Sequence, residues 1–192
     1  MRIIAGQYRS RSLVAPAGLA TRPTSDRLRE TLFNVLAPRI QGSAFLDLYA
    51  GSGAVGIEAL SRGAARVTFV EHAPAALKVM RDNLSRLGIT AGFTMSSGSV
   101  AAFLRRAPIN SLPFDLVFLD PPYDAAAEYA STLSLIASTS LIAPAALIIA
   151  EHRRKQPLAD RYGSLARTRL LEQGDAALSF YQLNSEGIEK RP

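Results

Sequence analysis

The four residues Asp120-Pro121-Pro122-Tyr123 have the types and spacing that could handle an amine substrate. They directly follow the apolar run 114–119, which predicts a buried strand, and the carboxyl ends of such strands form the ligand-binding edge of open α/β sheets. The Asp120 carboxylate could accept one N–H of an amine. The Pro121 carbonyl could accept the other, because the two proline rings fix φ and hold it in place. Tyr123 offers an aromatic face for an extruded or unpaired base.

This arrangement suits the methylation of an exocyclic amine on a nucleic-acid base. Such an amine is a poor nucleophile because its lone pair is delocalised into the ring. Two acceptors would pull the nitrogen toward tetrahedral geometry, and holding it within ~3–3.5 Å of a methyl carbon would supply much of the rate. The alternative is a strand that ends in a Pro-Pro loop, with Tyr123 in the core. We predict as catalytic residues Asp120, Pro121, Pro122 and Tyr123.

A glycine-rich turn precedes this group in the chain. The run Gly51-Ser52-Gly53-Ala54-Val55-Gly56 fits G-x-G-x-x-G between a predicted strand and a predicted helix, and its glycines permit a sharp turn close to a ligand. Glu71 lies 20 positions after Gly51, at the end of the next predicted strand, where it could accept both hydroxyls of a ribose. These two features fit NAD as well as S-adenosylmethionine. A turn without a ligand is the structural alternative.

Asp47 favours S-adenosylmethionine over a dinucleotide. It lies four residues before Gly51, where its charge could face a methionine amino group or sulfonium through a water. A diphosphate prefers helix N–H dipoles without an adjacent carboxylate, whereas S-adenosylmethionine carries no phosphate. His72 could touch the adenosine, although simple exposure is the alternative, and Asn83 is expected to have a packing or capping role. The predicted cofactor-binding residues here are Asp47, Tyr49, Gly51, Ser52, Gly53, Glu71 and His72.

Alternating strand and helix patterns predict one Rossmann-like α/β domain with a mostly parallel sheet covered on both faces. We expect this domain to span residues 21–186, after a basic hairpin extension in 1–20 and before a tail in 187–192. The expected hairpin pairs 3–5 with 12–14, and a second, antiparallel hairpin pairs 165–171 with 178–183. The expected helices are 26–36 (ended by Pro38), 55–62, 74–87, 100–106 and 126–137, and the expected strands are 44–49, 66–70, 92–95, 114–119 and 146–151.

Composition excludes several classes of protein. The 192 residues contain no cysteine and two histidines, so disulfides, thiolate chemistry and a protein-bound zinc site are not expected. No apolar stretch is long enough to span a membrane, and the first residues lack the apolar core of a signal peptide. We therefore expect a cytoplasmic protein that has no membrane partner and is a monomer.

The net charge of +6 is unevenly distributed. Residues 1–30 hold six arginines against two acids, residues 151–170 hold six basic residues against two acids, and residues 31–150 balance at eight of each. Such asymmetry favours a polyanionic partner, although a merely solubilising surface is the alternative. The predicted RNA-binding residues are Arg2, Arg9, Arg11, Arg22, Arg153 and Arg154.

The sequence resembles the bacterial 16S ribosomal RNA guanine-N2 methyltransferases of the RsmD type, which act on guanine 966. The likeness covers nearly the whole chain. It rests on Met1–Gly6, Thr21–Glu30, Leu32-Phe33-Asn34, Asp47–Gly53, Glu58–Ala64, Asp120–Tyr123 and Gly174-Asp175. The resemblance implies a class I methyltransferase fold with a seven-stranded sheet, S-adenosylmethionine as methyl donor, and 16S ribosomal RNA or the assembling 30S subunit as partner. It also implies that Arg22, Pro23 and Thr24 close over the cofactor or contact RNA.

One position departs from the family pattern. The family usually has a Gly-Asp pair after the third strand, whose acid binds the adenine amino group, whereas this sequence has Gly98-Ser99. Ser99 can still accept a hydrogen bond, so it joins the predicted cofactor-binding residues with a weaker expected contact. Backbone groups near 97–100 are the alternative.

Three rival functions fit the sequence less well. A DNA adenine-N6 methyltransferase also uses Asp-Pro-Pro-Tyr, but 192 residues leave little room for a target-recognition region. A non-catalytic RNA-binding protein of the same fold would have no need of Asp120. A dehydrogenase would give the Asp-Pro-Pro-Tyr run no role.

Overall fold

The computed structural model describes residues 1–15, 25–106, 112–122 and 126–184, so Arg22, Tyr123 and the expected tail lie outside the described residues. The helices are α1 (Asp26–Ile40), α2 (Ala54–Ser61), α3 (Pro74–Leu87), α4 (Val100–Arg105) and α5 (Ala126–Ser138). The strands are β1 (Ala44–Leu48), β2 (Arg66–Glu71), β3 (Phe93–Ser97), β4 (Phe114–Leu119), β5 (Ile142–Arg153), β6 (Arg161–Tyr162), β7 (Leu165–Gln173) and β8 (Ala176–Leu183).

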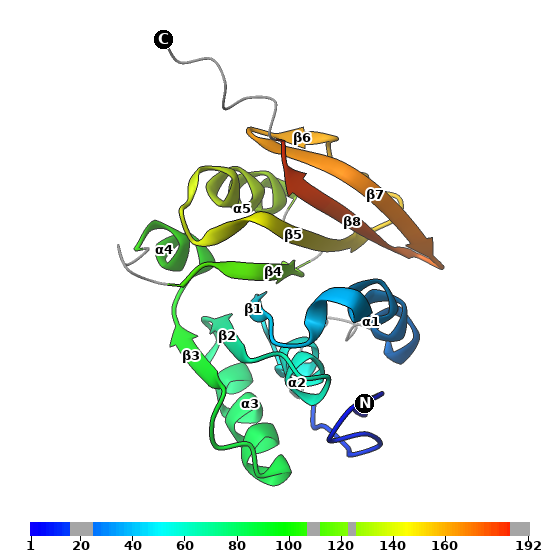
Figure 1. The fold of residues 1–192 in the computed structure, drawn as a ribbon, viewed down its shortest axis with the longest axis vertical. Coiled ribbons are helices and arrows are strands. Elements are labelled where there is room, and N and C mark those ends of the chain that lie inside the picture. Colours follow the sequence, from blue (N-terminus) through cyan, green and yellow to red (C-terminus); the bar gives the residue numbers. More distant parts are fainter. Residues whose placement is uncertain (16–24, 107–111, 123–125, 185–192) are drawn as a thin grey trace.

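All the strands join one sheet in the order β3-β2-β1-β4-β5-β8-β7-β6 (Figure 1). Neighbours from β3 to β5 pair parallel, and the pairs from β5 through β8 and β7 to β6 are antiparallel. The mostly parallel Rossmann-like α/β architecture with its terminal hairpin is thus confirmed. In the described part of the chain the sheet has eight strands rather than seven, because β6 adds a two-residue pair at the far edge.

Helices cover both faces of the sheet, which gives three layers. On β1, Phe45 packs into a core shared with α1, α2 and α3, while its neighbour Leu46 packs into a second core shared with α4 and α5. Both side chains are 0% exposed. This alternation follows from the two-residue period of a strand, and burying each such side chain contributes about 1.5–3 kcal/mol. Because both faces are buried, the central strands are apolar on both sides.

Helix α1 continues past the residue expected to end it. Pro38 lies inside the helix, which begins at the Ser25 cap and ends at Ile40. Proline removes one backbone hydrogen bond and normally kinks a helix. Here Leu36 and Ile40, on either side of it, are buried at 0% and 4% exposure, so packing against the sheet holds the last turn in helical form.

Strand β5 begins earlier than expected, at Ile142 rather than at 146. Its register against β4 shifts, because Phe114 pairs with Ile142 whereas Leu116 pairs with Leu147. The extra residues form a bulge that contains Pro144. A bulge accommodates a proline because the ladder hydrogen bonds are already interrupted there.

The N-terminal segment, residues 1–15 (the arm), folds back on itself as expected, but its antiparallel pairing is short. An isolated bridge joins Arg2 and Ser12, and two backbone hydrogen bonds of 3.0 Å flank it, from Ile3 N–H to the Arg11 carbonyl and from Leu13 N–H to the Met1 carbonyl. The N–H groups of Ile4 and Ala5 are bound by the carboxylate of Glu58 on α2, at 2.8 and 3.0 Å. The pairing therefore joins residues 1–3 with 11–13 rather than 3–5 with 12–14, because a helix side chain takes the amides of residues 4 and 5. Figure 1 shows the arm next to α2, at the opposite end of the molecule from β6.

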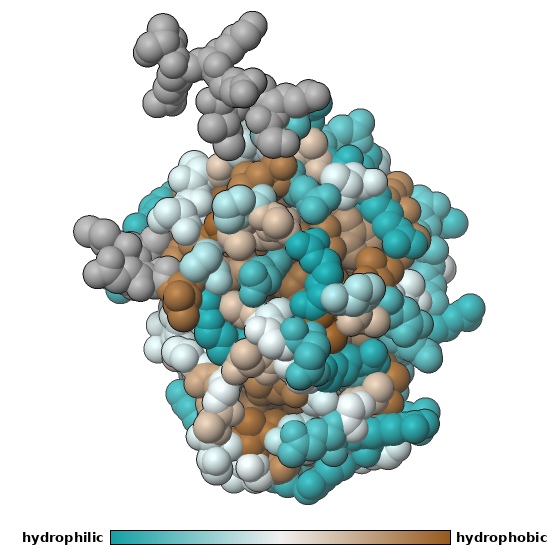
Figure 2. Space-filling model, viewed as in Figure 1, coloured by the Kyte–Doolittle hydropathy of each residue, from teal (hydrophilic) through white to brown (hydrophobic). Residues whose placement is uncertain are grey.

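Polar residues cover most of the face drawn in Figure 2, with small apolar areas between them. Among the described residues the large exposed apolar side chains are Val14, Leu112 and Leu170, which are far apart in sequence. Within the described ranges, no helix is both long enough and apolar enough to cross a bilayer. Scattered single apolar residues of this kind are normal on a protein surface.

Candidate active site

The predicted catalytic residues and the glycine loop lie at the carboxyl ends of β1 and β4, between which the strand order reverses. Strands β1 and β4 are neighbours, and Leu48 pairs with Leu119. The glycine loop therefore leaves β1 at the same level as Asp120-Pro121-Pro122 leaves β4. From β1 the sheet proceeds to β2 and β3 on one side, and from β4 to β5 on the other. Open α/β sheets bind ligands at such a switch point, outside the carboxyl ends of the strands.

The glycine loop has a conformation that only small residues accept. Gly51 and Gly53 have φ of +54° and +78°, in the left-handed region that disfavours side chains. Gly56 lies in the first turn of α2, where an added Cβ would be 2.2 Å from Cε1 of Phe69 on β2. The first two glycines thus shape the turn, and the third lets α2 approach the sheet closely.

Asp47 is a buried carboxyl beneath this loop. Its side chain is 1% exposed, and one of its oxygens accepts a hydrogen bond of 2.9 Å from the N–H of Gly56. Burial raises the pKa of the Asp47 carboxyl to about 8; the Gly56 bond lowers it, and the nearby charge of Glu71 raises it further. Loss of a proton here places a negative charge in an apolar setting, which a cationic ligand would compensate.

Glu71, at the end of β2, is fixed by three backbone amides. One oxygen accepts from Gly51 N–H at 2.9 Å, and the other accepts from His72 and Ala73 N–H at 2.8 Å each. An ionised carboxylate offers about four acceptor positions, so about one is left for a ligand. To bind both ribose hydroxyls, Glu71 would have to give up or share one of its hydrogen bonds from the backbone N–H groups. That contact with the ribose stays a prediction.

Three other predicted cofactor residues have contacts within the protein. His72 has a side chain that is 72% exposed, with Nδ1 at 3.4 Å from a Glu71 oxygen. Ser99 caps α4, because its hydroxyl oxygen accepts from Ala102 N–H at 3.2 Å. Ser52 is partly exposed in the loop, and its carbonyl accepts a hydrogen bond from Asn83.

The hydroxyl of Tyr49 forms hydrogen bonds with helix α5. Its hydroxyl lies 2.7 Å from a carboxylate oxygen of Glu128 and 2.6 Å from the hydroxyl of Thr132, both on α5. Its φ of +59° is rare for an aromatic residue, and such strain is typical of functional sites. Burial raises the pKa of this phenol, with a further rise from Glu128. Tyr49 therefore anchors α5, the helix that follows the Asp-Pro-Pro loop, and its direct cofactor role stays a prediction.

Asp120 lies beside an acid that sequence reasoning missed. Leu119 pairs with Ala150, so the next residues, Asp120 and Glu151, are neighbours on adjacent strands. Burial raises the pKa of the Asp120 carboxyl well above its usual range, and the charges of Glu151 and Asp47 raise it further. Glu151 is 1% exposed. Its place at the end of the predicted strand 146–151 was the signal that could have identified it.

The described residues of the proline pair differ in exposure: Pro121 is buried and Pro122 is exposed. Within the described ranges, no group of three or more His, Asp or Glu residues is arranged to hold a metal ion. The described part of the site contains carboxyl groups, backbone amides and the glycine turn.

The predicted RNA-binding arginines lie at two separate places. In the arm, the Arg2 side chain is 71% exposed and lies 3.8 Å from Asp26, Arg9 is exposed, and Arg11 donates to the carbonyl of Arg86 at 2.9 Å. Arg153 and Arg154 are exposed at the end of β5, and the Arg154 N–H donates to the Asp175 carbonyl in the turn between β7 and β8.

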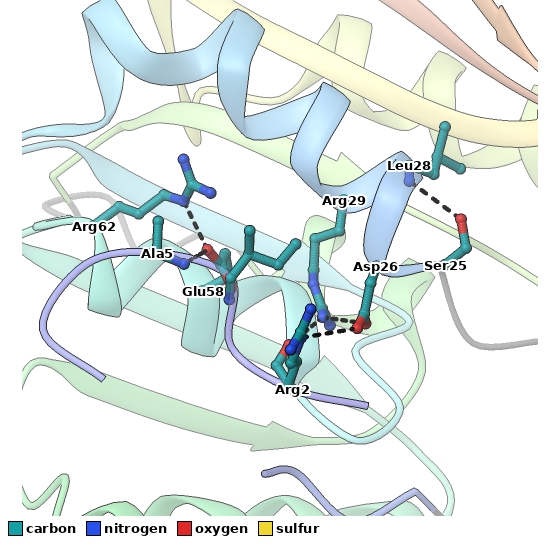
Figure 3. Close-up of polar contacts among 9 residues, drawn as sticks. Arg2, Ala5, Ser25, Asp26, Leu28, Arg29, Glu58 and Arg62 are labelled. Atoms are coloured by element: carbon teal, nitrogen blue, oxygen red, sulfur yellow. Dashed lines mark hydrogen bonds and ion pairs between the residues drawn. The ribbon is translucent and has the colours of Figure 1, made fainter. Parts of the chain in front are cut away.

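Two buried polar residues that hold the arm also escaped prediction. Glu58 is 0% exposed, and it accepts a hydrogen bond of 2.7 Å from Arg62 Nε in addition to those from the arm. Arg29 is also 0% exposed, and it donates hydrogen bonds to the carbonyl of Arg2 and to the carboxylate of Asp26 (Figure 3). Burial lowers the pKa of Arg29, while the charges of Glu58 and Asp26 raise it. These roles depend on contacts with the arm, which local patterns do not reveal.

Comparisons with known proteins place this geometry in a family. The sequence matches the family described as Conserved hypothetical protein 95 over residues 1–182. "Putative rRNA methyltransferase YlbH" of Bacillus subtilis (strain 168) is 36% identical over 182 residues, which cover 95% of this chain and 98% of that protein. "Ribosomal RNA small subunit methyltransferase D" of Escherichia coli (strain K12) is 36% identical over 189 residues, 97% of this chain and 92% of that protein.

A solved structure agrees with these sequence matches. The structure described as "Putative methyltransferase yhhF" from Escherichia coli has a TM-score of 0.84 and 34% sequence identity, and the match covers 96% of this chain and 98% of that one. The resemblance noted in the sequence is confirmed: this chain belongs to the family described as Conserved hypothetical protein 95, the RsmD family.

Proposed function

We propose that this protein transfers a methyl group from S-adenosylmethionine to the exocyclic N2 amine of a guanine in 16S ribosomal RNA, of the guanine 966 type. The observation that carries the proposal is the pairing of Leu48 with Leu119. It brings the glycine loop after β1 and the Asp120-Pro121-Pro122 loop after β4 to the same point of the sheet edge. The names of the relatives, which specify ribosomal RNA methyltransferases, support this substrate class.

The residues present fit S-adenosylmethionine better than a dinucleotide. Asp47, Glu71 and Asp120 gather at one edge, where the charge of Glu71 acts on Asp47 and the charge of Asp47 acts on Asp120. A diphosphate would oppose the ionisation of these carboxyls further, whereas a ligand that carries an ammonium and a sulfonium would favour their ionised forms. Asp47 would face the cationic part, Glu71 the ribose, and the glycine turn would permit close backbone approach. When bound, S-adenosylmethionine would supply an electrophilic methyl group.

The chain's own residues would prepare the amine. The ionised Asp120 carboxylate would accept one amine hydrogen and the Pro121 carbonyl the other, which would turn the nitrogen lone pair toward the donor. The contacts of Tyr49 with Glu128 and Thr132 hold the first turns of α5, and thereby one end of the loop that carries these acceptors. The basic arm and the 153–154 segment would bind phosphates of the RNA.

The decisive experiment follows methyl transfer from labelled S-adenosylmethionine to 30S subunits, naked 16S RNA and DNA, with nucleoside analysis of the product. We expect N2-methylguanine in RNA. N6-methyladenine as the product, or methylation of DNA alone, would contradict the proposal. The comparison of 30S subunits with naked RNA identifies which of the two is the substrate.

The Asp120→Ala variant tests the role of the carboxylate. We expect it to retain cofactor affinity within about tenfold while losing most of its turnover, because the substitution removes an acceptor needed only at the reacting amine. Asp82→Ala, on the exposed face of α3, is the matched control and should turn over normally. Normal turnover by Asp120→Ala would refute the mechanism.

A further inference from the structure

Asn83 on α3 joins two segments that are far apart in the sequence. Its side chain is 1% exposed, and its oxygen accepts a hydrogen bond from the N–H of Val14 at 2.9 Å. Its nitrogen donates to the carbonyl of Val14 at 3.0 Å and to the carbonyl of Ser52 at 3.1 Å. The side-chain amide thus pairs with both backbone groups of Val14, as a neighbouring strand would, and holds the glycine loop with its remaining hydrogen.

Other residues of the arm are also bound to α2 and α3. Ser61 of α2 accepts from the N–H groups of Gln7 and Tyr8, at 2.7 and 3.0 Å. Arg11 donates to the carbonyl of Arg86, in the last turn of α3. The arm therefore lies on α2 and α3 in one defined position, while the side chains of Arg2 and Arg9 remain exposed.

We propose that Asn83 is a positioning residue that couples the arm to the glycine loop, so that RNA on the arm and cofactor at the loop strengthen each other's binding. This inference rests on the proposed function, because it takes the arm as an RNA contact and the loop as the cofactor site. It goes beyond that function by making the two binding events depend on one side chain.

The physical reason lies in the burial of the shared amide. If the arm leaves its place on α3, Asn83 loses its two hydrogen bonds to Val14 and keeps one of three. A buried amide without partners is costly. The Ser52 carbonyl then has a less firmly held donor, so the turn at Gly51–Gly53 becomes less ordered. A ligand that fixes one segment therefore favours the ordered form of the other, and the effect on the two affinities must be equal.

Val14 offers a variant that removes the connection with little disturbance of the core. Val14→Pro removes the N–H that Asn83 accepts, whereas Val14→Ala keeps it and is the matched control. The Val14 side chain is 38% exposed, so neither substitution empties a core position. Asn83→Ala is the second variant, which removes the link from the other side.

The measurement is the affinity for S-adenosylhomocysteine, by titration calorimetry, with and without naked 16S ribosomal RNA. For the unmodified protein and for Val14→Ala, we expect RNA to raise this affinity by about tenfold, and S-adenosylhomocysteine to raise RNA affinity by the same factor. For Val14→Pro and Asn83→Ala, we expect both factors to fall close to one. A residue that only supports the fold would lower both affinities without changing their ratio.

Two outcomes overturn the inference and are distinguishable. If the unmodified protein methylates RNA but its two affinities are independent, or if both variants keep the full factor, the coupling is refuted and the proposed function stands. If the unmodified protein binds neither ligand and transfers no methyl group, the proposed function fails, and the coupling fails with it.

Discussion

Replacing Asp47 by asparagine should change how the stability of the free protein depends on pH. The Asp47 carboxyl has a pKa of about 8 in the folded protein. An aspartate in an unfolded chain has a pKa of about 4. A raised carboxyl pKa means that the folded state holds its proton at a pH where the unfolded chain has released it. The free energy of unfolding therefore falls as pH rises between about 4 and 8, and it becomes independent of this group above about 8.

The size of the effect follows from the shift. Each pKa unit corresponds to about 1.4 kcal/mol, so the roughly three units between pH 4 and pH 7 amount to an upper bound on the order of 4 kcal/mol. An amide at this position would be neutral in both states and would remove this slope, while its oxygen could still accept the Gly56 N–H. The new NH2 group would lack a built partner and would cost about 1–3 kcal/mol at every pH. The slope, rather than the absolute stability, is thus the quantity to compare.

The assay is urea unfolding at pH 5, 6, 7 and 8 in the absence of ligand. We expect the free energy of unfolding to fall with pH less steeply for Asp47→Asn than for the unmodified protein. The difference between the two slopes should correspond to close to one proton. The slope that remains depends on other groups: Asp120 titrates in the same direction, whereas His152, whose pKa is lowered by burial, opposes it. Asp82→Asn, at an exposed position, serves as the control. If Asp47→Asn and the unmodified protein have the same slope, the burial argument is wrong.

Three further predictions follow from the site and the sheet. Glu151→Gln should move the rise of kcat/KM with pH to lower pH, because Asp120 must be ionised to accept the amine hydrogen and loses a neighbouring negative charge; a pH profile that does not move would exclude this influence. Gly56→Ala should destabilise the protein by about 1–3 kcal/mol in urea unfolding, since its Cβ would lie 2.2 Å from Phe69, and an unchanged midpoint would show that α2 shifts freely. Arg9→Gln should weaken RNA binding and reduce the slope of log affinity against log salt by about one, whereas an unchanged slope would mean that Arg9 contacts no phosphate.

The sequence predicted the parts of the fold that depend on local patterns. The glycine turn, the strand before Asp120 and the helix that begins at Pro74 each have a signature within a few residues, and the structure has them at those places. Helix α1 passed Pro38 because the buried surface on both sides of it outweighs one lost hydrogen bond, and such a balance is invisible in a window of sequence.

The candidate site was predictable to a similar extent. The acids Asp47, Glu71 and Asp120 lie at or just after the carboxyl ends of strands, so their convergence at one edge could be inferred. The partners of Tyr49 on α5, and the neighbour of Asp120 on β5, depend on the order of strands in the sheet and on register. A one-residue shift in register would have placed Glu151 on the other face.

The docking of the arm sets an order in which the molecule can be completed during synthesis. The arm is synthesised before α2 and α3, yet its amides are bound by Glu58 and Ser61, and its far end by Asn83 and Arg86. These partners lie 53 to 75 residues later in the chain. The arm must therefore wait for its partners, and the basic surface that it carries takes shape only after α3 has emerged and folded.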